Sequence, residues 1–86
     1  LNDVARRSET NDGSVLAVGP ENAWIDLGFN QRLAAGMEFE VRNANTNRVK
    51  GRVRVVAVEA NKSRATILST ADKYDPIRAN DVLVNA

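Results

Sequence analysis

The densest chemical feature of the chain is a run of basic side chains in its middle. Seven lysines and arginines fall between positions 42 and 64, against a single acid, Glu59. Cationic side chains at this density can hold phosphate groups, and small β-barrels often bind nucleic acids through such surfaces while aromatic side chains stack on the bases. The candidate anion-contacting residues are Arg42, Arg48, Lys50, Arg52 and Arg54.

Charge balance and the shortage of aromatic residues weaken this interpretation. Twelve basic residues against eleven acidic ones give a formal net charge of +1, so the chain has no overall field that attracts a polyanion. Only four aromatic residues exist, and Phe39 is expected in the core, so no stacking platform accompanies the basic run. Arginines facing Glu38 and Glu40 across a hairpin would form exposed ion pairs, each worth less than about 1 kcal/mol. Nucleic-acid binding is therefore the alternative function.

Side chains that usually carry catalysis or hold metals are scarce. The chain has no Cys and no His, which excludes thiolate nucleophiles, imidazole bases, Cys/His zinc sites and disulfides. Asp72, Asp75 and Asp81 lack the spacing and the glycine of a calcium-binding loop. Outward-facing carboxylates on a sheet also lack a cleft that would shift their pKa values. We expect no catalytic residue, no metal and no cofactor.

The second candidate site is apolar. Trp24 alternates outward from Ile25, and Phe29 follows a glycine in a loop whose main apolar anchor is Leu33. Exposed aromatic side chains are typical of binding hot spots, although a cap that packs over the end of a barrel would use the same residues. The candidate protein-contacting residues are Trp24, Phe29 and Leu33.

Short strands must position these side chains. Apolar runs separated by Gly, Pro, Asn and Asp are typical of a compact β domain, and the segment 29–36 between two of them predicts a short helical turn or a wide loop. The fold class is therefore all-β: a small, partly open barrel of about six strands with SH3-like or related topology. The predicted strands are residues 14–18, 23–27, 37–42, 52–60, 64–68 and 81–84.

Strict alternation sets the register of two hairpins. Met37, Phe39 and Val41 alternate with polar residues, and a turn near Thr46 places Phe39 opposite Val53. The same turn sets Glu40 opposite Arg52 and Glu38 opposite Arg54. The apolar face then changes phase between Val55 and Val56, which predicts a β-bulge. A two-residue turn at Asn61-Lys62 predicts that Val56 faces Ile67 and that Glu59 faces Arg64.

A weak internal repeat links two strand entries. LAAGMEF (33–39) resembles IRANDVL (77–83), with an apolar anchor, a tight turn at Gly36 or Asn80, and then a strand. Both turn residues tolerate positive φ, so a repeated strand-entry turn explains the match better than a duplicated functional site. Residues 1–11 are polar and predict a linker or the end of an upstream helix, and residues 12–86 form the barrel domain. No segment is apolar enough for a signal peptide or a membrane span, so we expect no membrane insertion of this segment.

The barrel segments also carry a family resemblance. DGSV (12–15), IDLG (25–28), LAAGMEFEV (33–41), GRVRV (51–55), SRA (63–65) and PIRANDV (76–82) together resemble the small β-barrel at the C-terminus of flagellar assembly protein T, and related barrels appended to bacterial coiled-coil or envelope proteins. Family members typically carry Gly-Asp where this chain has Asn80-Asp81. The resemblance implies a non-enzymatic assembly module, often beyond the cytoplasmic membrane, and it supplies no catalytic residues.

The sequence thus predicts a non-catalytic protein-interaction or assembly module of a larger bacterial envelope or surface protein. Its expected partners are other proteins or copies of itself, met through loops and a strand edge. The expected location is the periplasm, cell envelope or surface, with the cytoplasm kept open. The alternative is a nucleic-acid-binding barrel that uses the basic hairpin.

Overall fold

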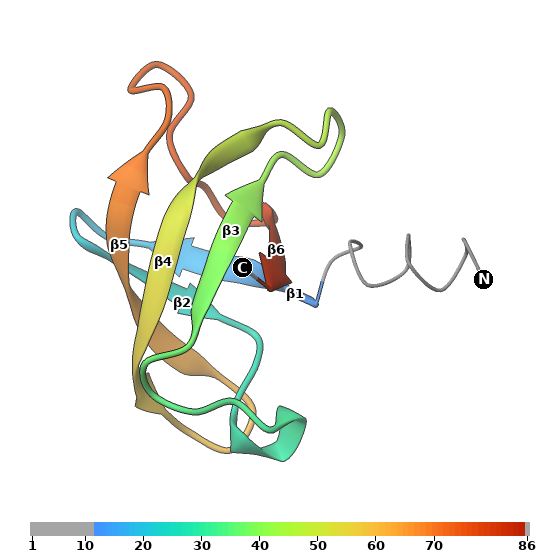
Figure 1. Ribbon diagram of the computed structural model, residues 1–86, viewed down its shortest axis with the longest axis vertical. Helices are drawn as coiled ribbons and strands as arrows, with labels where there is room; N and C mark the ends of the chain where they lie inside the picture. Colours follow the sequence, from blue (N-terminus) through green and yellow to red (C-terminus); the bar gives the residue numbers. More distant parts are fainter. Residues whose placement is uncertain (1–11, 86) are drawn as a thin grey trace.

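Six antiparallel strands and one 3₁₀ turn form the part of the chain that the computed structural model describes, residues 12–85 (Figure 1). The strands pair around a closed ring in the order β1-β2-β5-β4-β3-β6. The predicted all-β barrel of six strands is confirmed, and its ring is closed rather than partly open. The predicted linker or helix end, residues 1–11, lies outside the described residues. The elements are β1 (Gly13–Val18), β2 (Asn22–Ile25), η1 (Phe29–Gln31), β3 (Glu38–Arg42), β4 (Val49–Val58), β5 (Ser63–Thr70) and β6 (Val82–Asn85).

The register of the β3–β4 hairpin is confirmed. Phe39 lies opposite Val53, with Glu38 opposite Arg54 and Glu40 opposite Arg52. Alternation alone specifies this register, because a slip of one residue would turn every apolar side chain of β3 toward water. The strand β4 begins at Val49, earlier than the predicted start at residue 52.

The β4–β5 hairpin has the predicted bulge but a different register. The pairing shifts between Val55 and Ala57, so that Val56 is the extra residue and is 40% exposed. The N–H of Glu59 donates to the carbonyl of Lys62 at 2.9 Å, which makes Ala60-Asn61 the turn. Because the turn lies one residue earlier than predicted, Arg64 faces Ala57, two residues from its predicted partner, and the bulge moves Ile67 one residue further, to Val53. The predicted pairs of Arg64 with Glu59 and of Ile67 with Val56 are wrong.

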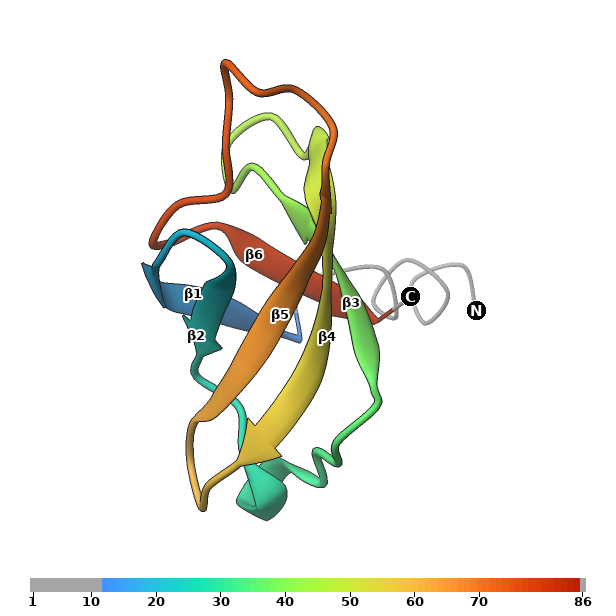
Figure 2. The same ribbon diagram turned by 90° about the vertical axis from the view of Figure 1, so that its left-hand side faces the viewer.

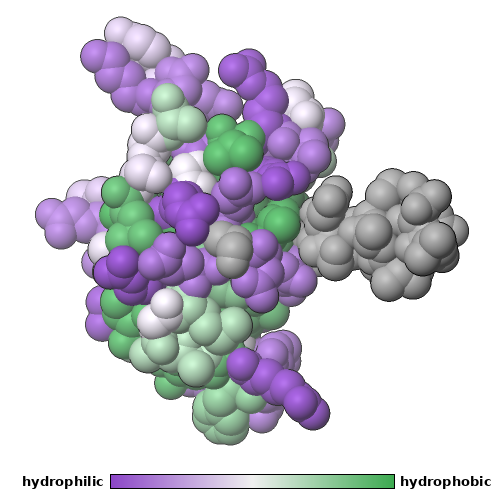
Figure 3. Space-filling model, in the orientation of Figure 1, coloured by the Kyte–Doolittle hydropathy of each residue, from purple (hydrophilic) through white to green (hydrophobic). Residues whose placement is uncertain are grey.

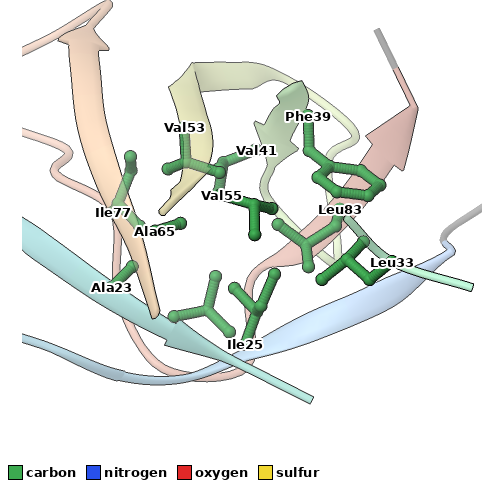
Figure 4. Close-up of a cluster of buried hydrophobic side chains, with 11 residues drawn as sticks. Ala23, Ile25, Leu33, Phe39, Val41, Val53, Val55, Ala65, Ile77 and Leu83 are labelled. Carbon is green, nitrogen blue, oxygen red and sulfur yellow. The ribbon is translucent and has the colours of Figure 1, made fainter. Parts of the chain in front are cut away.

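Inward positions of all six strands fill the barrel with apolar side chains. Phe39, Val53, Val55 and Leu83 are at most 2% exposed, and Leu33 and Ile77 reach into the same cluster from the two loops that close its ends (Figure 4). In Figure 4, Leu33 lies beside Leu83 at one end, whereas Ile77 lies beside Ala65 at the other. Burial of this set is the main source of stability for a chain so small.

The internal repeat is confirmed as a repeated strand entry. The N–H of Met37 donates to the carbonyl of Ala34, and the N–H of Asp81 donates to the carbonyl of Arg78, both at 3.2 Å. The turn residues Gly36 and Asn80 have φ of +97° and +76°. The side chains at the two strand entries even accept equivalent bonds: Met37 Sδ from the N–H of Ala34, and Asp81 Oδ2 from the N–H of Arg78.

This equivalence extends to the whole barrel, because β6, β1 and β2 repeat the geometry of β3, β4 and β5. The β1–β2 pairing shifts at Leu16, the position that corresponds to Val56. On the other side, Phe39 faces Val53 as Leu83 faces Gly13. The matched pairs of the two hairpins are Val55–Ala65 with Val15–Ile25, Ala57–Arg64 with Ala17–Trp24, and Val58–Ser63 with Val18–Ala23. An approximate two-fold axis therefore passes between Trp24 and Arg64, which face each other on β2 and β5.

Loops give the two ends of the barrel different surfaces. The segment from η1 to β3 covers one end, and the loop between β5 and β6 covers the other (Figures 1 and 2). In Figure 3 the lower end, over η1 and the chain that leads into β3, is mainly green, whereas the upper loops are mainly purple. Apolar contacts are thus available on one end and on the strand faces, and polar groups dominate the opposite end.

Candidate functional site

Trp24 lies on the outer face of the barrel, as its alternation predicts, and is 36% exposed. Its neighbour on β1 is Ala17 and its neighbour on β5 is Arg64, which in turn faces Ala57 on β4. Lys62 Nζ lies 5.9 Å from the centre of the indole ring, within the range of a cation–π contact. One exposed aromatic side chain therefore lies beside two cationic ones, both from β5 and the turn that precedes it.

Two β-bulges, at equivalent places in β1 and β4, add apolar side chains on either side of the cross-strand row Ala17, Trp24, Arg64 and Ala57. Leu16 and Val56 are the extra residues of β1 and β4, and they are 49% and 40% exposed. A bulge turns the local side chains, and here it leaves both on the surface. We call the set Leu16, Ala17, Trp24, Val56, Ala57, Lys62 and Arg64 the β2/β5 face. Figure 2 looks onto this side of the barrel, where β5 lies between β2 and β4.

Sequence reasoning identified Trp24 but missed its companions on this face. A signal for them exists in the sequence, because V-L-A-V (15–18) and V-V-A-V (55–58) mark the two equivalent bulges. The predicted β4–β5 register also hid the neighbourhood, since it paired Arg64 with Glu59 instead of placing it between Ala57 and Trp24.

Phe29 is 60% exposed but belongs to a different surface. It begins η1, which packs on the β4–β5 turn through backbone bonds from Phe29 to Glu59 and from Asn30 to Ala60, at 2.9 and 3.0 Å. The approach is close, because a Cβ on Gly28 would overlap the carbonyl oxygen of Glu59. The turn is thereby fixed at the end of the barrel.

Leu33 does not join the surface of either aromatic residue. It is 6% exposed and packs in the core cluster, so its assignment as a contact residue is corrected. The loop that carries it closes the barrel, and an apolar side chain there lies inward for the same reason as Ile77 at the opposite end. Trp24, Phe29 and Leu33 thus do not form one site.

Most of the predicted anion-contacting residues are engaged in ion pairs. Glu38 lies 3.1 Å from both Arg52 and Arg54, and Glu40 lies 2.7 Å from Arg42. The hydrogen bonds from Arg52, then from Arg54, lower the pKa of Glu38 below its usual value. Arg48 is exposed in the loop before β4 and pairs with no carboxylate of residues 12–85.

Lys50 is the exception among these cations because it is buried. Its side chain is 2% exposed, and Nζ lies 2.8 Å from Asp81 and 3.4 Å from Asp75. A buried ammonium group held by two carboxylates offers no site to an external anion, so this assignment is corrected. The pair instead attaches the β5–β6 loop to β4, and the sequence hides this because the partners lie far apart along the chain.

Carboxylates in the loops serve turns rather than a cation site. Asp72 Oδ1 accepts the N–H of Tyr74, and Asp81 Oδ2 accepts the N–H of Arg78. Asp26 accepts both the N–H and the hydroxyl of Ser14 at 2.7 Å. Within residues 12–85 no three His, Cys, Asp or Glu side chains lie together in a way that could hold a metal ion.

One open pocket of about 210 Å³ lies at the end of the barrel that η1 covers. Its volume is smaller than the roughly 300 Å³ at which small-molecule sites begin. The pocket is lined by Asp12, Leu27, Gln31, Leu33, Met37, Phe39 and Asn85.

No helix in the described part of the chain is long and apolar enough to cross a membrane.

Comparisons with known proteins place the fold only. No family model and no curated protein matches the sequence. The barrel is similar in structure to part of the assembled ATPase EscN from the type III secretion system of enteropathogenic E. coli, with a TM-score of 0.62 and 9% sequence identity. The match covers 87% of this chain and 16% of that chain, so the barrel corresponds to a small portion of the ATPase.

Proposed function

We propose that this barrel is a non-catalytic protein-interaction module that presents its β2/β5 face to a protein within a larger bacterial envelope or surface assembly. The observation that carries the proposal is the exposure of Leu16, Trp24 and Val56 on one rigid sheet surface. Tryptophan is enriched among interface hot spots, and a cluster of apolar side chains around it would exclude water from the contact.

The closed ring changes the expected mode of contact. A partner cannot add a strand where both edges of each strand are paired, and β1 pairs with β6 to complete the ring. Binding through side chains on the barrel surface therefore replaces the strand edge predicted from sequence. Because inward positions are already filled, the surface is held in place before a partner arrives, which lowers the entropic cost of binding.

Two likenesses support the envelope location. The sequence resembles the C-terminal barrel of flagellar assembly protein T, and one similar solved structure is an ATPase of a type III secretion system. A barrel with likenesses to these two proteins suits a role in assembly, and the proposed envelope location rests on them. The partner in our proposal is a protein, because apolar side chains outnumber cations on the β2/β5 face.

Nucleic acid is the second candidate partner, and one specific observation favours it. Trp24 lies beside Lys62 and Arg64, which supply the combination of a stacking ring and phosphate-binding cations that the β3–β4 hairpin lacks. A titration with single-stranded and double-stranded oligonucleotides, followed by the fluorescence of the one tryptophan, tests this candidate. A proportional loss of affinity as salt rises would show phosphate contacts, whereas no binding at low salt would remove it.

Photo-crosslinking tests the proposed function itself. The full chain would carry p-benzoylphenylalanine at position 24 in the cell that makes the protein, with the same substitution at Tyr74 as the control, because Tyr74 is 82% exposed in a loop away from β2. We expect protein adducts from position 24 that position 74 does not give. Adducts to nucleic acid, or none that distinguish the two positions, would overturn the proposal.

A further inference from the structure

The β2/β5 face has a property that identifies one particular partner. On this face and in the strand positions next to it, outward residues form cross-strand pairs whose members differ in kind: Trp24 faces Arg64 and, beside the face, Asn22 faces Thr66. Asp26 and Lys62 are the next residues beyond the last printed pair, Ile25 with Ser63, and the same register extended past the strand ends would set them opposite each other. Each pair thus joins an aromatic ring with a guanidinium, an amide with a hydroxyl, or a carboxylate with an ammonium group.

Such a surface is complementary to itself. Consider two copies that face each other through this surface, related by a two-fold axis that lies between them and runs parallel to β2 and β5, midway between the two strands. Each outward residue of β2 in one copy then lies against the β5 residue of the second copy that pairs with it within a single chain. Trp24 then meets Arg64, and Asp26 meets Lys62, twice in each dimer. The same axis brings β1 of one copy over β4 of the other, where the exposed bulge residues Leu16 and Val56 lie offset by about one residue along the strands.

The surroundings of the charged pair support this arrangement. Asp26 is held in position by two hydrogen bonds from Ser14, and Lys62 already leans over the Trp24 ring. Two copies facing each other in any arrangement that set Arg64 against Arg64 would place like charges together. The parallel-axis arrangement instead gives each cation either a ring or a carboxylate, which is the charge complementarity that favours a second copy as the occupant.

We infer that the β2/β5 face is the contact between two copies of this chain, with Trp24 of each copy packed on Arg64 of the other. This inference rests on the proposed function and names the partner. A small contact of this kind is a weak one, so association is measured by sedimentation equilibrium at up to millimolar protein. The mass-average value should rise with concentration from 9.4 kDa toward about twice that mass.

A residue exchange provides the decisive test. Trp24→Arg places two arginines against each other at both contacts, and we expect the dissociation constant to rise at least about tenfold. The double variant Trp24→Arg/Arg64→Trp restores an arginine facing a tryptophan, and we expect it to recover association. Phe29→Ala is the matched control, because it removes an exposed aromatic residue from another surface and should leave association unchanged. Far-ultraviolet circular dichroism and thermal unfolding show that each variant keeps the fold.

The outcomes separate the two proposals. A chain that stays monomeric at millimolar concentration, a dimer that survives Trp24→Arg, or a folded double variant that does not recover would each overturn the dimer. The crosslinking at position 24 then still reports on the proposed function: adducts with a different protein keep the interaction module and reject self-association, and adducts with oligonucleotides reject both.

Discussion

Trp24 and Arg64 face each other on adjacent strands and also occupy equivalent positions in the two halves of the barrel. The two halves therefore share a backbone but present opposite chemistry at their common boundary. An apolar ring and a cation can occupy equivalent backbone positions because both side chains lie on the outside of the barrel, where core packing does not restrict the residue type.

The buried ion pair leads to the first prediction. Lys50→Ala should lower the free energy of unfolding by about 3 kcal/mol or more, because it leaves Asp81 buried without its cation. Urea unfolding followed by circular dichroism measures the loss. Arg54→Ala is the control, since its ion pair with Glu38 is exposed and should cost less than about 1 kcal/mol. Equal losses in the two variants would contradict the burial of Lys50.

Ser63 gives a prediction in the opposite direction. Its hydroxyl is buried and has no hydrogen-bond partner among the described residues, and the equivalent residue in the other half of the barrel is Ala23. Ser63→Ala should therefore raise the free energy of unfolding by about 1 kcal/mol, because it removes an unpaired polar group from the core. Ser69→Ala, at an exposed position of β5, is the matched control and should change little. Destabilisation by Ser63→Ala would mean that the hydroxyl has a partner.

The strand-entry turn predicts which side chains Gly36 can accept. Its φ of +97° disfavours L-residues, while a Cβ there would meet nothing within 4 Å, so the cost is conformational rather than steric. Gly36→Ala should lower the free energy of unfolding by about 1 to 2 kcal/mol. Gly36→Asn should cost less, because asparagine already holds the equivalent left-handed turn at Asn80. Thermal unfolding ranks the two variants, and the reverse order would contradict the equivalence of the turns.

The pH dependence of Glu38 follows from its two arginines. Its pKa in the folded state lies below the ordinary value of 4.5, chiefly because of the hydrogen bond from Arg52 and then that from Arg54. Glu38 therefore contributes stability above the ordinary pKa, and this contribution disappears as the pH falls through the lower folded-state pKa. A carboxyl-carbon NMR titration should show the depressed pKa, and Arg52→Gln should raise it. A titration at the ordinary value in the unmodified chain would contradict the ion pairs.

Local alternation predicted the part of the fold that depends on neighbours in sequence. Phe39 and its flanking glutamates alternate strictly, so the β3–β4 register was correct to the residue. The β4–β5 register was wrong because the turn closes at Ala60-Asn61, one residue earlier than predicted, and the alternation of side chains does not specify where a turn closes. The bulge at Val56 then shifts the pairing beyond it by one further residue.

Contacts between distant segments account for the remaining differences. Nothing near Lys50 in the sequence indicates that it will pair with Asp81. Leu33 lies in a loop, and it joins the core only because that loop closes one end of the barrel. The sequence shows the equivalence of the two halves only at the strand entries. The reason is that the half made of β6, β1 and β2 combines the last strand of the described chain with the first two. Its β6 comes last and its β1 and β2 come first, so a search for tandem repeats passes over it.

The neighbouring ends of the barrel determine how it would respond to tension. The N–H of Asn85 donates to the Asp12 carboxylate at 2.7 Å, and β1 pairs with β6 at two positions, flanked by backbone bonds from Asp12 to Leu83 and from Val15 to Asp81. Force applied through the segments on either side of the barrel would pull these two strands apart from the same end, so their hydrogen bonds would break one after another instead of sharing the load. The β1–β6 seam is therefore where the barrel would open first under tension.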